Sequence, residues 1–515
     1  MNYLIWILLI TLSLIEKSII TQQKLVKSHQ IIQRNYTDSI DHFSSSNLLK
    51  FNSPNAEKFY VNGKNITFVD FDAGPSYAGL IPVSSNPGET RQLFFWFWPS
   101  ESDIGANDLT FWTNGGPGCS SLESLLQETG PISWRLGQAR PVKNPFSWTK
   151  LSSMLYVEQP VGTGYSEGKV QAHNETDIAR DLFGFFQQWL KVFPEMCHKN
   201  FYLTGESYAG YYIPYIADYI YTHQSDLSLP LQGIYIIDPV LSYNVVQNEI
   251  PAWPMVQRYE YVFGINKTFK AELETLHHEC GYADYISKYH TFPPPPGPFP
   301  IPAVGTYDDP SSVNETCALW EKIYNASVIV NPAFDVYHIF DTEPILWDVL
   351  SGTTEGSQLW PNQKGDPTYF NRTEVKQMLH VPISSNWSEC SYKDVFIDHD
   401  SSVPVSMSVL PGVIEKSKRT IIAHGLADFV LIAMGARIAI QNMTWHGSQG
   451  FSKPIEKDFL VEGQGTMGRW QLERGLMYAE IELSGHMLPQ YQPKAAYQMF
   501  QYLLGQIDSP SALSV

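Results

Sequence analysis

Short apolar runs alternate with longer amphipathic stretches through the first half of the chain. Stretches 176–189 and 211–221 carry apolar residues at helical spacing. Runs rich in β-branched and aromatic residues are typical of strands, and they occur at 65–69, 93–98, 109–112, 154–157, 201–204 and 233–237. Strands that alternate with helices predict a largely parallel sheet with helices on both faces.

The pattern changes after residue 241. Residues 292–300 read FPPPPGPFP, which can continue neither a helix nor a central strand. A stiff surface loop is favoured there over a proline-rich ligand for another protein. We therefore expect 242–400 to be an insertion. A strand-like run at 419–423 then returns the chain to the sheet, and 493–504 predicts a terminal helix.

The N-terminus predicts export. Residues 4–15 form an almost purely apolar run, which has the length of a signal peptide and is too short to span a bilayer. We expect cleavage loosely between residues 18 and 23. The predicted organisation is a signal peptide (1–22), a polar leader (23–55), a core in two parts (56–241 and 401–515) and the insertion between them.

Composition and charge narrow the class of protein. With 43% hydrophobic and 17% charged residues among 515, the chain is typical of a globular protein. A net charge of -18 argues against nucleic acid or an anionic membrane surface as a partner, because the field of the protein would repel both. We expect no membrane-spanning segment, and the oligomeric state stays open.

Acceptor triplets for N-linked glycans support a lumenal or extracellular route. Nine are spread along the chain, at Asn35, Asn65, Asn174, Asn266, Asn314, Asn325, Asn371, Asn386 and Asn442.

Five cysteines are consistent with an oxidising compartment. They are Cys119, Cys197, Cys280, Cys317 and Cys390, and none is spaced as a zinc site requires. We expect no metal and no cofactor. Two disulfides and one free thiol are the simplest arrangement. Cys280 and Cys317 would close a local loop, a cross-link that contributes ~4 kcal/mol in the chain-entropy model.

The sequence FYLTGESYAG at 201–210 places a serine between a predicted strand and a predicted helix. Such a sharp elbow projects the Ser207 hydroxyl beyond the sheet, above the helix N-terminus. The strict G-x-S-x-G pattern is broken by Ala209, with Gly210 one place later. On the pattern alone, a chance turn is an equal alternative.

A serine nucleophile needs a base and a group that orients the base. In this type of fold they follow in the order serine, acid, histidine. Asp428 comes just after the strand-like run at 419–423, and His486 lies between a strand-like run and the final helix. Other histidines, such as His277, His278 and His446, lack that context.

A glycine-rich segment, FWTNGGPGCSS at 111–121, follows an early strand. It matches neither a phosphate-binding loop nor a dinucleotide-binding fingerprint. In a hydrolase it would supply a second backbone N–H to the tetrahedral oxyanion. A plain turn is the alternative.

Four segments in this order resemble the serine carboxypeptidase family: 112–122 (WTNGGPGCSSL), 156–166 (YVEQPVGTGYS), 205–210 (GESYAG) and 485–489 (GHMLP). The resemblance spans roughly residues 55–505, and 441–445 with 450–451 are most similar to the secreted fungal-type branch. It implies an α/β-hydrolase fold, with a mostly parallel central sheet, helices on both faces and a large inserted cap at 242–400.

The resemblance also implies roles for individual residues. Ser207 would be the nucleophile, His486 the base and Asp428 its orienter. The remaining implied roles are oxyanion donors at Gly116 and Tyr208, a site for the substrate's terminal carboxylate at Asn114, Gly115, Glu206 and Glu128, and a disulfide between Cys119 and Cys390. Around Asp428 the chain reads HGLADFVL, where many relatives have Ser-Gly, further acids and a final Pro. Met487 resembles the branch that favours apolar substrates.

The expected activity is therefore a serine-type carboxypeptidase that removes C-terminal residues from peptides and proteins through an acyl-enzyme. Acidic pH is expected to favour it, because Glu206 can donate to a carboxylate only when protonated. Two alternatives stay open: an acyltransferase of the same family, and a non-catalytic secreted glycoprotein of the same fold. The protein would act in secreted fluid or in an acidic vacuolar or lysosomal lumen.

Overall fold

The structure, a computed structural model, describes residues 51, 53–302, 304, 313–341, 348–350 and 368–511. The predicted signal peptide, nearly all of the predicted leader and Asn35 lie outside the described residues. The described residues belong to one unit of the chain, Lys50–Val515.

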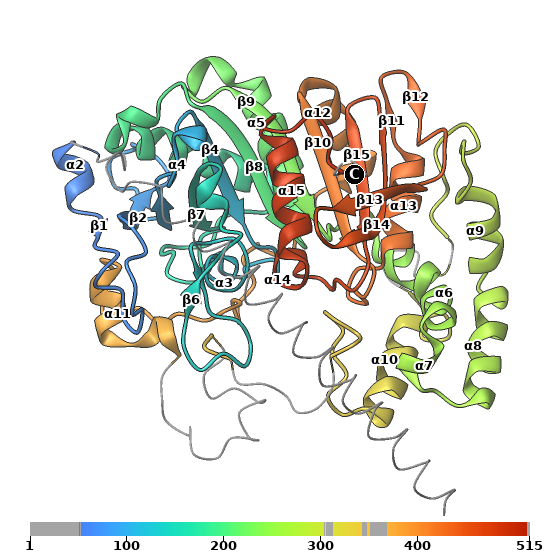
Figure 1. Cartoon of the computed structure of the whole chain (residues 1–515). Helices are drawn as coiled ribbons and strands as arrows, with labels where there is room; N and C mark the ends of the chain where they lie inside the picture. Colours follow the sequence, from blue (N-terminus) through green and yellow to red (C-terminus); the bar gives the residue numbers. More distant parts are fainter. Residues whose placement is uncertain are drawn as a thin grey trace, which may run out of the picture. The chain divides into compact units, whose positions relative to one another are not determined.

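An eleven-stranded mixed sheet organises this unit (Figure 1). Its strands, in spatial order, are β1 (Tyr60–Val61), β2 (Ser76–Pro82), β3 (Gln92–Trp98), β7 (Ser153–Glu158), β4 (Asp108–Thr113), β8 (Asn200–Glu206), β9 (Leu231–Ile237), β10 (Arg419–Gly425), β15 (Leu476–Ile481), β14 (Gly465–Glu473) and β13 (Lys457–Val461). The central strands from β7 to β15 are parallel, and the strands at both edges are antiparallel. The predicted parallel sheet is confirmed.

Strand β4 shows why helices cover both faces. All its residues are buried, as in strands covered on both sides. Phe111 meets Phe186 of α4 (Glu175–Val192), with 5.4 Å between ring centroids. The next residue, Trp112, points to the opposite face and meets Trp148 at 5.3 Å. Trp148 in turn stacks on Phe500 of α15 (Pro493–Leu503) at 4.0 Å.

The predicted strand at 65–69 is wrong. The segment forms a turn instead, in which the Val69 N–H donates to the Ile66 carbonyl at 3.0 Å. Phe68 has φ +64°. Just before it, the Asn62 side chain accepts from the Lys64 N–H at 3.0 Å. Asn-Gly turn chemistry therefore prevails over the β propensity of the residues that follow.

Between β9 and β10 the regular elements among the described residues are helices. The larger helices are α6 (Ile250–Arg258), α8 (Lys267–Glu279), α9 (Tyr282–Tyr289) and α10 (Leu319–Val330). They bury their own apolar cluster, which includes Leu273, Tyr282 and Leu319 and which Phe429 joins from the loop after β10. By contrast, α11 (Thr373–Met378) packs on the main core through Val375, beside β1 and β2 at the other end of the sheet (Figure 1). The boundaries 242 and 400 of the expected cap stay a prediction.

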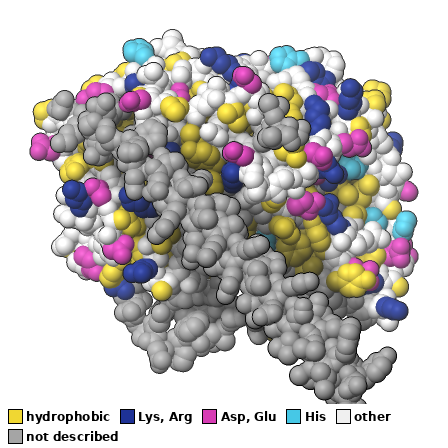
Figure 2. Space-filling model, viewed as in Figure 1, with side chains coloured by type: hydrophobic (Ala, Val, Ile, Leu, Met, Phe, Trp, Pro, Cys, Tyr) yellow, Lys and Arg dark blue, Asp and Glu magenta, His cyan; other side chains and the backbone are white. Residues whose placement is uncertain are grey.

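The remaining α-helices and strands of the described residues complete this unit. They are α2 (Pro54–Glu57), α3 (Leu122–Gln127), β5 (Ile132–Ser133), β6 (Val142–Lys143), α5 (Ala209–Thr222), α7 (Glu260–Phe263), α12 (Leu410–Lys416), α13 (Ala433–Asn442), β11 (Thr444–Trp445), β12 (Ser448–Gln449) and α14 (Leu488–Tyr491). Acidic and basic side chains are interspersed on the face that Figure 2 shows. Over the described part of the chain, no helix combines the length and the apolar character needed to cross a membrane.

Candidate active site

Ser207 occupies the sharp turn between β8 and α5. Its φ is +65°, in the left-handed region that residues other than glycine rarely adopt. Close packing shapes this elbow, because a Cβ on Gly205 would lie 2.5 Å from the Thr113 carbonyl oxygen. The Ser207 N–H donates to the Ile237 carbonyl at 2.9 Å, which ties the turn to β9. The serine remains partly exposed at the carboxyl edge of the sheet.

His486 and Asp428 form a buried hydrogen-bonded pair. The imidazole Nδ1 lies 2.7 Å from Oδ2 of Asp428, and the other carboxylate oxygen accepts the N–H groups of Val430 at 2.8 Å and Leu431 at 3.1 Å. With the Nδ1 proton directed at the carboxylate, Nε2 presents its lone pair. Nε2 is buried and has no hydrogen-bond partner. The histidine is thus held in the tautomer of a general base.

The topology brings the three residues to one edge. Ser207 follows β8, Asp428 follows β10 and His486 follows β15, and these parallel strands lie in the order β8-β9-β10-β15. Their carboxyl ends meet at the same edge of the sheet, where this architecture holds its functional groups. Ser207 Oγ does not hydrogen-bond to Nε2 in this structure.

Residues 114–121, the glycine loop, run against the nucleophile. A Cβ on Gly115 would lie 2.2 Å from the Tyr208 nitrogen and 2.8 Å from Cβ of Ser207, so only glycine permits this approach. A disulfide between Cys119 and Cys390 fixes the loop. The N–H groups of Gly116 and Tyr208 lie in the two segments that meet here. This is where an oxyanion hole is expected beside a serine nucleophile.

Asn114 is held in one orientation by groups that the sequence did not single out. Its Oδ1 accepts the indole N–H of Trp112 at 2.7 Å, and its Nδ2 donates to Oε2 of Glu123 at 3.0 Å. These contacts distinguish the two ends of the amide. From the sequence, Trp112 is placed at the end of a predicted strand and within segment 112–122, but its side chain is given no role, and Glu123 is not singled out.

Glu206 and Glu128 form a second buried group beside Ser207. They are 3% and 2% exposed, and their carboxyl groups lie close enough to hydrogen-bond through a shared proton. Burial, followed by the charges of Glu128, Glu123 and Asp238, raises the pKa of Glu206 well above its usual range. Burial also raises the pKa of Glu128. The pair therefore retains a proton at pH values where exposed glutamates have lost theirs.

One group of described residues has the spacing of metal ligands. Atoms of Asp238, Asp428 and His486 lie within 4.8 Å of one another. One of these contacts, between His486 Nδ1 and Asp428 Oδ2, is a hydrogen bond, and backbone N–H groups also donate to Asp428 and to Asp238. The spacing is thus explained by a hydrogen-bonded network.

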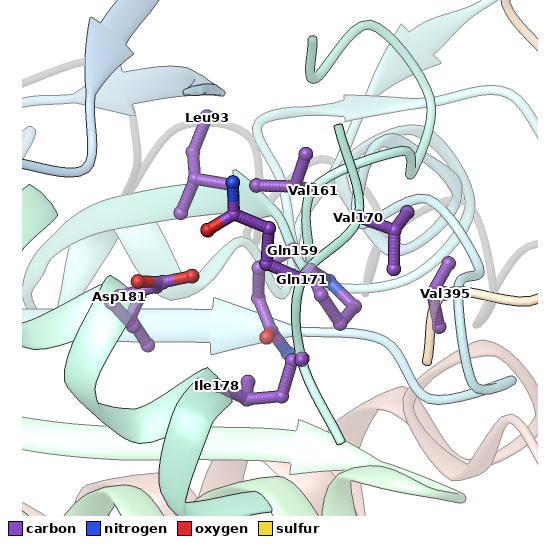
Figure 3. Close-up of a pocket in the computed structure, with 11 residues that line it drawn as sticks. Leu93, Gln159, Val161, Val170, Gln171, Ile178, Asp181 and Val395 are labelled. Atoms are coloured by element: carbon purple, nitrogen blue, oxygen red, sulfur yellow. The ribbon is translucent and has the colours of Figure 1, made fainter. Parts of the chain in front are cut away.

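A separate pocket is lined by other residues (Figure 3). Its wall is mainly apolar and includes Leu93, Val161, Val170 and Val395. The acid in that wall, Asp181, is paired with Arg91 at 2.6 Å. The lining contains none of the predicted site residues.

The cysteines pair in the expected way. Besides Cys119–Cys390, with an S–S distance of 1.99 Å, a disulfide joins Cys280 and Cys317 at 2.01 Å. Cys197 is a free thiol. Cys119–Cys390 links the glycine loop to the segment before β10, across 271 residues of sequence.

The fold and the site together define a serine hydrolase of the α/β-hydrolase class. A solved structure of similar fold is a prohormone-processing carboxypeptidase, Kex1(delta)p from Saccharomyces cerevisiae, with a TM-score of 0.67 and 21% identity over 88% of this chain and 98% of that chain. The family model described as "Serine carboxypeptidase" matches residues 68–506.

Curated relatives agree with the family model. A probable serine carboxypeptidase of Arthroderma benhamiae is 42% identical over 477 residues, covering 88% of each chain. Serine-type carboxypeptidase F of Aspergillus niger is 41% identical over 472 residues, covering 86% of each chain. The chain belongs to the serine carboxypeptidase family, and it is a hydrolase of the serine-type carboxypeptidase class.

Proposed function

We propose that Ser207, His486 and Asp428 release C-terminal residues from peptides through an acyl-enzyme. His486 Nε2 takes the proton of the Ser207 hydroxyl as Oγ attacks the carbonyl carbon of the last peptide bond. Asp428 holds the Nδ1 proton and stabilises the imidazolium. His486 then passes its proton to the leaving amino group, and water attacks the acyl-enzyme by the same steps in reverse.

The oxyanion would be held by the backbone N–H groups of Gly116 and Tyr208. Two observations support this assignment. Gly115 brings the glycine loop within contact distance of Tyr208, and the disulfide at Cys119 holds that loop in place. Two fixed donors stabilise the oxyanion as its negative charge develops, because they are already in place and need no reorganisation.

Recognition of the free C-terminus would depend on Asn114 and Glu206, with Gly115 assisting and Glu128 supporting Glu206. Asn114 directly follows β4 and Glu206 ends β8, and these two strands are neighbours with Thr113 opposite Gly205. A protonated Glu206 can donate to a terminal carboxylate, whereas an ionised one would repel it. The burial of Asn114, Glu206 and Glu128 beside the nucleophile is the observation that carries the exopeptidase proposal, and the raised pKa of Glu206 agrees with it.

The experiment compares the purified protein with its Ser207→Ala variant on a dipeptide with a blocked N-terminus. We expect loss of amino-acid release by at least about 10³-fold. Ser225→Ala, which changes an exposed hydroxyl bonded only to Asp226, is the matched control and should retain activity. Equal release by wild type and Ser207→Ala would refute the nucleophile. Product analysis with added alcohol separates hydrolysis from acyl transfer.

We also propose that the protein works in secreted fluid or in an acidic lumen. The two disulfides and the glycan acceptor triplets support this location. The acceptors differ in accessibility: Asn65, Asn266, Asn314, Asn325 and Asn386 are exposed. The Asn371 amide instead donates to the Trp387 carbonyl at 2.7 Å and to Thr368 Oγ1 at 2.8 Å. A glycan on Asn371 would therefore have to displace an internal hydrogen bond.

A further inference from the structure

A further buried carboxyl lies behind the triad acid. Asp238 directly follows β9, the strand between those that lead to Ser207 and Asp428. Its side chain is fully buried. Each of Asp238, Asp428 and His486 has an atom within 4.8 Å of the other two. The mechanism proposed above gives Asp238 no role.

The hydrogen bonds of Asp428 leave one acceptor position open. An ionised carboxylate has about four lone-pair directions. Two are taken by the N–H groups of Val430 and Leu431 and one by His486 Nδ1. The fourth lone-pair direction can accept one more hydrogen bond. Asp238 is a nearby side chain whose own hydrogen bonds are incomplete.

The surroundings of Asp238 favour a neutral carboxyl. One oxygen, Oδ1, accepts the Gly425 N–H at 2.7 Å, and the other, Oδ2, is buried without any donor. The nearest group that could be a cation is His424, whose Nε2 lies 3.4 Å from Oδ1. That Nε2 donates to the Leu431 carbonyl at 2.6 Å, and burial lowers the pKa of His424, which favours the neutral ring. Among the described residues, no Lys or Arg is paired with Asp238.

We propose that Asp238 keeps a proton on Oδ2 and donates it to the carboxylate of Asp428, and so acts as a positioning residue for the triad. This assignment gives each of the two carboxyl groups a complete set of partners. Burial first, and then the charge of Asp428, raise the pKa of Asp238 well above its usual range, which agrees with the assignment. The hydrogen bond fixes the plane of the carboxylate to which His486 is bound.

The same stretch of backbone also supports the nucleophile. The carbonyl of Ile237, the residue before Asp238, accepts the Ser207 N–H at 2.9 Å. Asp238 itself has φ +42°, a left-handed conformation that Asp, Asn and Gly tolerate best. The titratable groups that face Asp238 from neighbouring elements are His424, Asp428, His486, Glu128, Glu206, Tyr235 and Tyr478.

The test compares Asp238→Asn with Asp238→Gly. Asparagine can accept the Gly425 N–H and still donate from Nδ2 to Asp428, but it cannot titrate. Glycine removes the donor and keeps the left-handed backbone. The substrate is a blocked amino-acid ester, which lacks a terminal carboxylate and so bypasses the Glu206 site. Activity is measured from pH 4 to 7. The control is Asp108→Asn. Asp108 is a buried acid at the first residue of β4, whereas Asn114 of the site follows the last residue of that strand.

We expect Asp238→Asn to retain kcat within about threefold, and Asp238→Gly to lose roughly 10- to 100-fold, the usual effect of a lost hydrogen bond to a charged group. In Asp238→Gly the acid side of the kcat profile should also move to higher pH, since a carboxylate that loses a donor is protonated more readily. A loss of packing alone would lower activity without that shift.

Three outcomes would overturn the proposal. One is a folded Asp238→Gly protein with the wild-type kcat and pH profile, and another is the same loss of kcat with the profile unmoved. The third is an Asp238→Asn protein that unfolds normally on heating yet has lost kcat as far as Asp238→Gly, because Asp238 would then act as an anion. If Asp238→Gly does not fold, Asp238→Asn decides alone.

Discussion

Two carboxyl pairs flank Ser207, and they differ in what surrounds them. In the pair Asp238–Asp428, the donor-rich pair, two backbone N–H groups and His486 donate to Asp428, and a third backbone N–H donates to Asp238. In the pair Glu206–Glu128, the donor-poor pair, Oε2 of Glu206 is buried without a donor. Donors stabilise an anion, whereas burial without donors stabilises the protonated acid. The donor-rich pair can thus supply a fixed negative charge to the base, and the donor-poor pair a proton to the substrate.

The largest expected effect comes from the donor-rich pair. Asp428→Asn should lower kcat by about 10⁴, because an amide that donates to His486 imposes the wrong tautomer. The loss should be the same for a blocked dipeptide and for a blocked ester, since both need the base. Steady-state kinetics on the two substrates measure it, with Asp108→Asn as control. An ester activity that survives in Asp428→Asn would show that Asp428 does not orient the base.

The donor-poor pair should instead govern KM, and only for substrates with a free carboxylate. Glu206→Ala is expected to raise KM for a blocked dipeptide roughly 10- to 100-fold at pH 5, the value of a hydrogen bond to a charged group. KM for the ester should change little. In the wild type, the peptide KM should rise as pH rises, because the pair loses its proton and then repels the substrate carboxylate.

Glu206→Gln separates the hydrogen bond from the titration. Glutamine can donate at every pH, so its peptide KM should be nearly flat from pH 4 to 8. A wild-type KM that is itself flat over this range would contradict the role of the donor-poor pair. If Glu206→Ala impaired turnover of the ester as much as turnover of the peptide, Glu206 would support the turn at Ser207 rather than bind the substrate carboxylate.

The sequence predicted most of the sheet, because buried parallel strands are recognisable as isolated apolar runs between glycines and polar residues. Strands β3, β4, β7, β8 and β9 all coincide with such runs. The predicted strand at 65–69 is wrong because a hydrogen bond to the Asn62 side chain stabilises a turn just before it. The periodicity of apolar residues carries no information about such side-chain hydrogen bonds.

The site was predicted unevenly for a similar reason. Ser207 sits in a local pattern of strand, turn and helix, so the sequence alone nominates it. Asp238 and Asp428 are far apart in sequence and meet only because β9 and β10 are neighbours in the sheet. Trp112 likewise becomes recognisable as a partner of Asn114 only from the direction of its indole N–H. Contacts between side chains across strands require the three-dimensional structure.

A buried carboxyl without a paired acid tests whether burial alone is enough to hold a proton. Glu249 precedes α6 and is 4% exposed, and its Oε2 accepts the Trp320 N–H at 2.9 Å. Burial raises the pKa of Glu249 from 4.5 to about 7. The folded state therefore binds this proton more tightly than the unfolded state. Its contribution to stability is fully present below about pH 4.5 and is lost as pH rises through about 7.

The smallest expected effect follows from this single group. Stability of the wild type should fall between pH 5 and 8, and Glu249→Gln should remove up to about 2 kcal/mol of that fall, because glutamine does not titrate. Thermal unfolding midpoints at pH 5, 6.5 and 8 measure it. Glu272→Gln, an exposed change within α8, is the matched control and should leave the pH dependence as it is. If Glu249→Gln also left it unchanged, burial without a paired acid would be too weak to hold the proton. The retention of protons beside Ser207 would then depend on the pairing of the carboxyl groups.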